Sequence, residues 1–237
     1  MIEQYAVNIQ GVTIGGIEMC RRLLSPEKAR RVDRFRFDAD KVRCTVGEAL
    51  VRYLTVQRYG VPNGRLQFAY AERGKPYFTG DAAAVHFNLS HAGDWVVCAI
   101  GPGPLGIDVE HVKDRKVTFA SAALSEGEYA RWCALPEDRQ SGEFYRLWTM
   151  KESYSKLLGV GLSLGFPTVD VIPDQDGFFT IAQDDSCVLY TQMLTPLDPV
   201  TVCAERARKQ ELDLKIRFLD AETLERFAQA EAGRYGS

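Results

Sequence analysis

The spacing of apolar residues in the N-terminal part predicts helices and strands in alternation. A first helix is expected to begin at Ser25-Pro26-Glu27, because serine caps a helix end and proline suits the first helical position. A second helix is expected from about Asp38 to Gly60, where apolar residues recur at steps of three and four. Strands are expected where apolar residues alternate or form short runs, at residues 5–9, 66–70, 85–89 and 95–100.

The C-terminal part repeats this kind of pattern, although the two parts share no visible sequence repeat. A short helix is expected after Ser125, where Ser125-Glu126-Gly127-Glu128 has the form of a capping box. A longer helix is expected from about Gly142 to Leu158, followed by Gly159. A terminal helix is expected at 220–232, and Asp176-Gly177 predicts a hairpin turn. Strands are expected at residues 107–112, 168–172, 178–181, 188–193, 200–204 and 216–219.

The strongest break between the two parts is Gly101-Pro102-Gly103-Pro104. We therefore expect an N-terminal subdomain of residues 1–104 and a C-terminal subdomain of residues 105–237, with a tail from about residue 205. Residues 101–106 also fit the G-x-G-x-x-G pattern of dinucleotide sites, but they lead into an expected strand and contain two prolines, so we reject that interpretation.

Composition narrows the possible functions. Hydrophobic residues make up 46% of the chain, which is enough for a packed core. The 29 Lys and Arg against 32 Asp and Glu give a net charge of −3, which disfavours a general nucleic-acid surface. The apolar runs are too short for a membrane span, and no signal peptide is visible, so a cytoplasmic protein is expected. The spacing of the cysteines and histidines predicts reduced thiols and no transition-metal site.

A carboxylate pair lies in Gly106-Ile107-Asp108-Val109-Glu110. On a strand, Asp108 and Glu110 point to the same face. They repel each other unless a cation lies beside them, and an oxygen-ligated divalent ion such as Mg²⁺ would serve. The solvated side of an edge strand would show the same pattern, so this pair alone is not specific.

The segment from Trp148 to Lys156 is expected to be helical. Glu152 and Lys156 are four residues apart and therefore neighbours on one helix face. An exposed Glu–Lys pair of no functional importance would look the same, and Lys151 could equally be a surface charge.

The segment Phe87-Asn88-Leu89-Ser90-His91 ends an expected strand at a turn. A hydroxyl, an imidazole and free backbone N–H groups can meet an anion there, but an ordinary polar turn is the simpler interpretation. A hydrolase with Ser90 as nucleophile is disfavoured, because no GxSxG sequence surrounds it.

In this order and spacing, the three segments resemble the signature of the 4′-phosphopantetheinyl transferases. The segments are FNLSH at 87–91, GIDVE at 106–110 and WTMKESYSK at 148–156. The larger, surfactin-synthetase-activating (Sfp-like) class is the most similar. The resemblance runs from about Ser25 to Phe166 and includes Gly74-Lys75-Pro76 and Gly161-Leu162-Ser163-Leu164. The tail after Ala204 shows no usable resemblance.

The resemblance implies an α+β fold of two similar α/β subdomains related by pseudo-two-fold symmetry, with coenzyme A bound in the cleft between them. It implies Mg²⁺-dependent transfer of the 4′-phosphopantetheine arm from coenzyme A to a serine hydroxyl of an apo carrier protein, releasing adenosine 3′,5′-bisphosphate. The carrier would be of the acyl, peptidyl or aryl type. Smaller members of the family build their site between subunits, so the length of this chain implies a monomer that carries the whole site.

The resemblance also implies roles for single residues. The Mg²⁺ ligands would be Asp108, Glu110 and Glu152. Residues facing coenzyme A would be Lys28, Arg31, Arg43, Lys75, Ser90, His91 and Lys156, with Lys156 at the pyrophosphate and with Lys75 and His91 near the 3′-phosphate. The residues closest to the chemistry would be Asp108, Glu152 and Lys156. Arg31 stands where lysine is common in the family, and Cys44 stands where a small hydroxyl residue can contact the nucleotide.

Several alternatives remain open at this point. The base that takes the serine proton would be Glu152, directly or through a bound water, or else Glu128, whose capping-box position already explains it. A non-catalytic module that binds coenzyme A or a carrier protein, and a Mg²⁺-dependent phosphodiesterase, are the rival functions. The identity of the carrier and the tolerance for acylated coenzyme A are not encoded in any recognisable motif.

Overall fold

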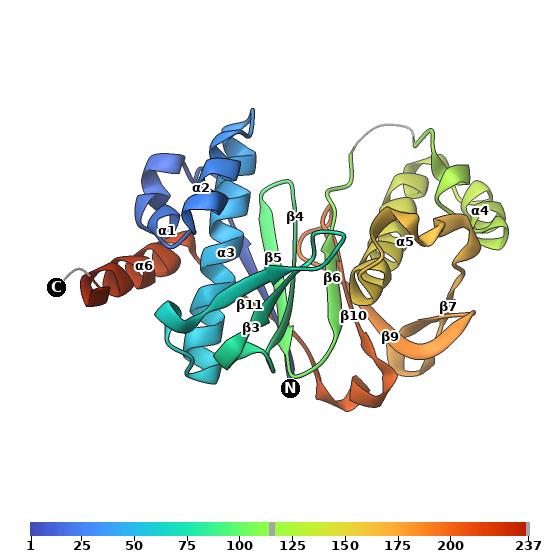
Figure 1. Ribbon diagram of the computed structural model, residues 1–237. Helices are drawn as coiled ribbons and strands as arrows, with labels where there is room; N and C mark the ends of the chain where they lie inside the picture. The colour runs from blue at the N-terminus through green and yellow to red at the C-terminus, as the bar shows by residue number, and fades with distance from the viewer. Residues whose placement is uncertain (114–116, 236–237) are drawn as a thin grey trace.

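The computed structural model describes residues 1–113 and 117–235, and it shows two sheets side by side, each covered by a long helix (Figure 1). The N-terminal half contains β1 (Ile2–Asn8), α1 (Glu18–Arg22), α2 (Pro26–Asp33), α3 (Asp38–Tyr59), β2 (Gln67–Tyr70), β3 (Pro76–Thr79), β4 (His86–Ala92) and β5 (Trp95–Gly101). The rest contains β6 (Leu105–Val109), α4 (Glu126–Cys133), α5 (Glu137–Leu158), β7 (Val171–Pro173), β8 (Phe179–Ile181), β9 (Asp184–Met193), β10 (Pro199–Glu205), β11 (Leu212–Leu219) and α6 (Ala221–Tyr235).

The two halves repeat one arrangement. One sheet has the strand order β11-β1-β5-β4, and the other has the order β6-β10-β9-β8-β7. In the first sheet β1 pairs antiparallel with β5, and in the second sheet β6 pairs antiparallel with β10. The first strand of each half therefore pairs with the second strand of a later hairpin. The helices α3 and α5 are each 22 residues long, and each is preceded by a short helix. The α+β fold of two similar halves is therefore confirmed.

Local sequence determines where the helices begin and end. The Ser25 hydroxyl accepts a hydrogen bond from the Lys28 N–H at 3.1 Å, which caps α2. Ser125 and Glu128 form the expected capping box of α4. The helices α3 and α5 both end at a left-handed glycine, Gly60 and Gly159. The helix α5 begins at Glu137 instead of near Gly142, because its first turns are polar and carry no apolar periodicity.

The last strand and helix belong to the N-terminal half, where the expected division placed them in the C-terminal subdomain. The strand β11 pairs parallel with β1, and α6 packs against α1 and α3. The carboxylate of Glu225 in α6 accepts hydrogen bonds from the backbone N–H groups of Met19 and Cys20 at 2.7 and 2.9 Å. A carboxylate at these first-turn N–H groups caps α1. The division at residues 104 and 105 otherwise stays a prediction.

A hydrophobic cluster joins the two sheets. It contains Ile2 and Val97 of the first sheet and Ile107 and Val202 of the second, all nearly fully buried. Contacts between β4 and β6 bring the sheets together, and the Asn88 side-chain oxygen accepts a hydrogen bond from the Ile107 N–H at 2.9 Å. The two halves are therefore packed as one body along the contact between β4 and β6. None of the helices described within residues 1–113 and 117–235 has the length and apolarity that a bilayer span requires.

Candidate active site

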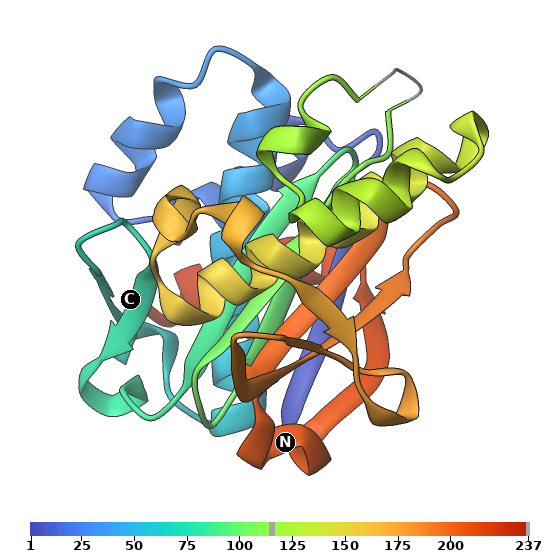
Figure 2. The same ribbon diagram turned by 90° about the vertical axis from the view of Figure 1, so that its right-hand side faces the viewer.

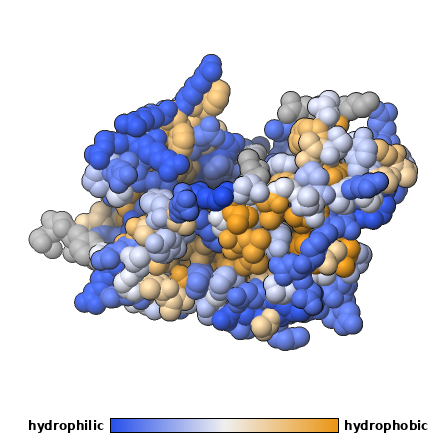
Figure 3. Space-filling model, turned by 45° about the vertical axis from the view of Figure 1, so that its right-hand side comes forward, coloured by the Kyte–Doolittle hydropathy of each residue, from blue (hydrophilic) through white to orange (hydrophobic). Residues whose placement is uncertain are grey.

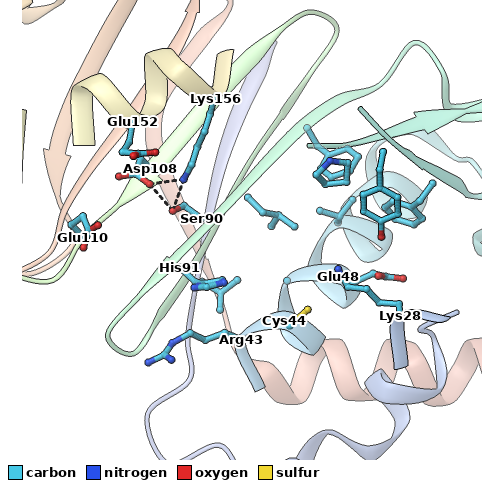
Figure 4. Close-up of a pocket in the computed structure, with 18 of the residues that line it drawn as sticks. Lys28, Arg43, Cys44, Glu48, Ser90, His91, Asp108, Glu110, Glu152 and Lys156 are labelled. Carbon is cyan, nitrogen blue, oxygen red and sulfur yellow. Dashed lines mark hydrogen bonds and ion pairs between the residues drawn. The ribbon is translucent and has the colours of Figure 1, made fainter. Parts of the chain in front are cut away.

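A cavity of about 560 Å³ lies between the two halves. The space-filling view shows the surface hollowed between them (Figure 3). Residues of α2, α3 and the β2–β3–β4 region line one side, and residues of β6 and α5 line the other (Figure 4). The lining includes Lys28, Arg43, Cys44, Ser90, His91, Asp108, Glu110, Glu152 and Lys156. The three segments singled out in the sequence thus meet in one place.

Gly106 determines how closely β6 approaches α5. A Cβ atom at this position would lie 2.0 Å from the Ser153 carbonyl oxygen and 2.6 Å from the Leu157 nitrogen. Only glycine allows the strand and helix backbones to come this close. This contact places the two acidic residues at the end of β6 beside the helix that carries Glu152 and Lys156.

Asp108 is the buried centre of the cluster, with 4% of its surface exposed. Its Oδ1 accepts hydrogen bonds from the Ser90 hydroxyl at 2.7 Å and from the Lys156 ammonium at 2.5 Å. The Lys156 ammonium also donates to the Ser90 hydroxyl at 2.9 Å (Figure 4). The Oδ2 atom of Asp108 is buried without a hydrogen-bond partner. A buried carboxylate oxygen without a partner is costly, and a cation or a donor from a ligand would relieve that cost.

The two neighbouring carboxyl groups have raised pKa values. Burial is the main cause for Glu110, and the charge of Asp108 adds to it. Burial also raises the pKa of Glu152, and Asp108 and Glu110 raise it further. Two carboxyl groups with raised pKa values beside the buried Asp108 carboxylate form a region that favours a divalent cation. Within residues 1–113 and 117–235, no three acidic, His or Cys side chains already surround a common point as a finished metal cage would require.

The other end of the cavity is basic and aromatic. The Arg43 guanidinium is held by Asp40 at 2.8 Å and by the Gly93 carbonyl at 2.7 Å. Loss of water lowers the pKa of His91, and the positive charge of Arg43 lowers it further. The Lys28 ammonium lies 6.0 Å from the centre of the Tyr70 ring.

Two of the expected coenzyme A residues do not line this cavity. Arg31 is exposed in a separate basic groove of about 540 Å³, which it shares with Lys28, Arg30 and Arg34. The Lys75 ammonium donates hydrogen bonds to the backbone carbonyls of Leu105 and Lys156. Lys75 is therefore paired with backbone oxygens, where a ligand phosphate was expected.

Lys151 and Glu128, whose roles the sequence left open, stabilise the fold and do not line the cavity. Lys151, which could have been a surface charge, is completely buried, and its ammonium lies 2.5 Å from the Glu128 carboxylate. The same ammonium donates hydrogen bonds to the carbonyls of Ala123 and Phe166 at 3.0 and 2.9 Å. Glu128 also accepts from the backbone N–H groups of Ser125 and Val171. With its oxygens engaged in this way and its side chain outside the cavity, Glu128 is not positioned to take a proton from a substrate.

The sequence analysis did not predict the aromatic wall of the cavity. Phe68, Tyr70 and Phe87 line the cavity, together with Glu48. Glu48 forms a buried ion pair with Arg52 at 2.9 Å, and the Arg52 guanidinium lies 4.8 Å from the centre of the Phe68 ring. The alternation of residues 66–70 predicted the strand, but it does not show whether an aromatic side chain faces a core or a cavity.

Known proteins show the same two-part organisation. Residues 16–102 match the family model described as 4′-phosphopantetheinyl transferase, N-terminal, and residues 104–203 match that of the 4′-phosphopantetheinyl transferase superfamily. The 4′-phosphopantetheinyl transferase psf-1 of Bacillus pumilus is 35% identical over 198 residues, which cover 82% of this chain and 84% of that protein. This chain belongs to the 4′-phosphopantetheinyl transferase superfamily.

A second relative agrees with this assignment. The 4′-phosphopantetheinyl transferase Sfp of Bacillus subtilis (strain 168) is 38% identical over 184 residues, which cover 76% of this chain and 82% of that protein. A solved holo-(acyl-carrier-protein) synthase from Bacillus anthracis aligns with 42% of this chain and 92% of its own, at 20% identity and a TM-score of 0.36. The protein is an Sfp-type 4′-phosphopantetheinyl transferase, which transfers 4′-phosphopantetheine from coenzyme A to a carrier protein, as the three segments predicted.

Proposed function

We propose that the cavity between the halves holds coenzyme A and Mg²⁺, with Asp108, Glu110 and Glu152 as the residues that hold the ion. The observation that carries this proposal is the buried Asp108 Oδ2, which has no partner and lies in a cluster of mutually repelling carboxyl groups. Mg²⁺ prefers carboxylate oxygens combined with substrate phosphate oxygens and water, so these residues fit it. When bound, the ion would offset negative charge on the phosphate groups of coenzyme A.

The basic residues of the cavity would receive the remaining phosphate charge. Lys28 lies at the end of the cavity away from Asp108, Glu110 and Glu152, and His91 and Arg43 lie between that end and the carboxyl groups, where they suit the nucleotide phosphates. Ser90 and Lys156 lie between the two ends, next to Asp108. Lys156 would stabilise the charge that develops on the pyrophosphate, after exchanging its contact with Asp108 for one with the substrate. Arg31 would add charge at the outer groove.

The reaction requires a base next to the carrier serine. In the proposed step, the serine oxygen forms a bond to the β-phosphorus of coenzyme A, and the bond from that phosphorus to the bridging oxygen breaks, releasing adenosine 3′,5′-bisphosphate. Glu152 would accept the serine proton, directly or through a water, because its carboxylate lies in the cavity beside Asp108. Positioning by the two halves would supply much of the remaining acceleration.

The proposed function also includes the oligomeric state and the type of carrier. Both sides of the cavity come from one chain, so a monomer would carry the whole site. Light scattering that shows an obligate dimer would contradict the proposed monomer.

The carrier would be an acyl, peptidyl or aryl carrier protein. Comparing transfer rates over a panel of apo carriers would identify the preferred one.

The test of the metal assignment is a single substitution at Asp108. We expect Asp108→Ala to abolish the mass gain of an apo carrier protein incubated with enzyme, coenzyme A and Mg²⁺. We also expect it to abolish the increase in thermal stability that added Mg²⁺ gives the wild-type protein in the presence of coenzyme A. Asp138→Ala, which removes an exposed carboxylate from the same half, is the control and should retain both. An Asp108→Ala protein with full activity would refute the assignment.

A further inference from the structure

The turn that joins β2 to β3, residues 71–75, reaches from the N-terminal half to the end of α5. The hairpin extends toward β6 and α5 in both ribbon views (Figure 1, Figure 2). The Lys75 ammonium donates hydrogen bonds to the carbonyl of Leu105 at 3.2 Å and to the carbonyl of Lys156 at 2.5 Å. The Arg73 guanidinium donates to the carbonyl of Val160 at 2.7 Å and to the hydroxyl of Ser163. Two neighbouring cations of one half thus hold backbone atoms of the other.

The backbone atoms that Lys75 contacts are those that position the candidate site. Leu105 begins β6, which carries Asp108. Lys156 lies in the last turn of α5, where helix carbonyls have no partner within the helix and the helix dipole is negative. An ammonium group there supplies the missing donor and suits the dipole. Lys75 therefore fixes the backbone of Lys156, while the side chain of Lys156 reaches Asp108 and Ser90.

The other side of the same turn borders the basic groove. Tyr70 and Gly74 line this groove together with Lys28, Arg31 and Arg34. Gly74 adopts a left-handed backbone with φ of 81°, which shapes the turn without a side chain on the groove side. One short turn thus lies against both the basic residues of α2 and the end of α5.

We infer that Arg73 and Lys75 form a clasp between the halves and that Lys75 is a positioning residue for Lys156, not a ligand of a coenzyme A phosphate. This inference rests on the proposed function of the cavity. The clasp holds the end of α5 and the start of β6 at one distance, so that the Lys156 ammonium and the Asp108 carboxylate face the reacting phosphate. Loss of the clasp would displace the Lys156 ammonium from the reacting phosphate. A displacement of about 1 Å can lower a rate about 100-fold.

The experiment compares Lys75→Met with wild-type enzyme, using coenzyme A and 3′-dephospho-coenzyme A as substrates for the same apo carrier. We expect kcat to fall about 10- to 100-fold with both substrates, with the KM for coenzyme A little changed. The preference for coenzyme A over its dephospho form should stay as in wild type. A raised KM for coenzyme A together with a lost preference would overturn the clasp and assign Lys75 to the 3′-phosphate. An unchanged kcat would also overturn it.

A second variant tests whether Lys75 acts through Lys156. If it does, Lys75→Met should lower kcat no further in a Lys156→Ala protein, because the side chain that it positions is gone. Additive losses would contradict the inference.

Arg73→Ala removes the exposed member of the clasp. It should lower kcat less than Lys75→Met does, with KM unchanged. It replaces Lys75→Met as the test if that variant fails to fold. Lys215→Met, an exposed lysine on β11, is the matched control and should behave as wild type. Absence of transfer by the wild-type enzyme would instead reject the proposed function.

Discussion

At the scale of single residues, the pair Lys151 and Glu128 shows how an ordinary charged side chain becomes structural. Both side chains are completely buried, and their charged atoms lie 2.5 Å apart. Burial lowers the pKa of Lys151, and the Glu128 charge opposes that shift. The additional hydrogen bonds from Ser125 and Val171 satisfy the carboxylate, so the buried pair is fully compensated.

We therefore expect Lys151→Met to lower the free energy of unfolding by about 3–5 kcal/mol, because it leaves an uncompensated buried carboxylate. Chemical denaturation would measure this change. The double variant Lys151→Met with Glu128→Gln should recover part of the loss. Lys41→Met, which breaks an exposed ion pair with Asp38, is the control and should change stability by less than about 0.5 kcal/mol. An equally small effect at Lys151 would contradict the structure.

The raised pKa values of Glu110 and Glu152 predict a pH dependence. A carboxyl group whose pKa rises on folding stabilises the protein below its unfolded-state pKa, and that contribution is lost as pH rises through its folded-state pKa. In metal-free buffer, the double variant Glu110→Gln with Glu152→Gln should therefore gain thermal stability relative to wild type as pH increases from about 4 to 7. The opposite trend would show that these groups are not destabilised when charged.

Magnesium should reverse this difference. At pH 7 in the presence of coenzyme A, added Mg²⁺ is expected to raise the melting temperature of the wild type but not of the double variant, because an ion that binds only the folded state stabilises it. At low pH, where protonated carboxyl groups compete with the ion, the wild-type shift should shrink.

The sequence allowed most of these residues to be found, but not all of their roles. Asp108, Ser90, Glu152 and Lys156 were singled out and do meet around one buried carboxylate. Lys75 was expected at the 3′-phosphate, and Lys151 was left open, because a lysine in the sequence does not show whether its partner is a phosphate, a carbonyl or a carboxylate. Those partners come from distant segments, such as Leu105 for Lys75 and Ala123 for Lys151.

At the scale of elements, the contact between β6 and α5 depends on one glycine. We expect Gly106→Ala to lower the free energy of unfolding by about 3 kcal/mol or more, because its Cβ would overlap the backbone at Ser153. Activity should also fall, since β6 carries Asp108. Gly142→Ala is the matched control: it lies exposed in α5 with nothing within 4 Å of the added Cβ, so it should increase stability by up to about 1 kcal/mol. Equal effects of the two substitutions would contradict the described packing.

Elements whose boundaries depend on local chemistry were predicted well. The caps at Ser25 and Ser125 and the terminal glycines of α3 and α5 act within a few residues, so the sequence contains the necessary information. The hairpin turn at Asp176 and Gly177 was also expected, and both residues adopt left-handed backbone angles. The partner of β11 could not be predicted, because a strand pattern does not specify which distant edge the strand will join.

At the scale of the whole molecule, α6 connects the end of the described chain to its beginning. We expect Glu225→Ala to lower the free energy of unfolding by about 1–2 kcal/mol, because two backbone N–H groups of α1 lose their acceptor. Thermal or chemical unfolding would measure the loss. Glu222→Ala, an exposed residue one turn earlier in the same helix, should change stability by less than about 0.5 kcal/mol. If both variants unfold alike, the cap contributes nothing.

The parallel pairing of β1 with β11 has a consequence for synthesis on the ribosome. Among the described strands, β1 emerges first and its neighbour β11 emerges last. Until then one edge of β1 has no partner, and the site on α1 that accepts α6 stays exposed. The second sheet, β6 to β10, can be complete while the first sheet still lacks β11. We therefore expect the half that is translated first to finish folding last, contrary to the usual order in which N-terminal domains fold first.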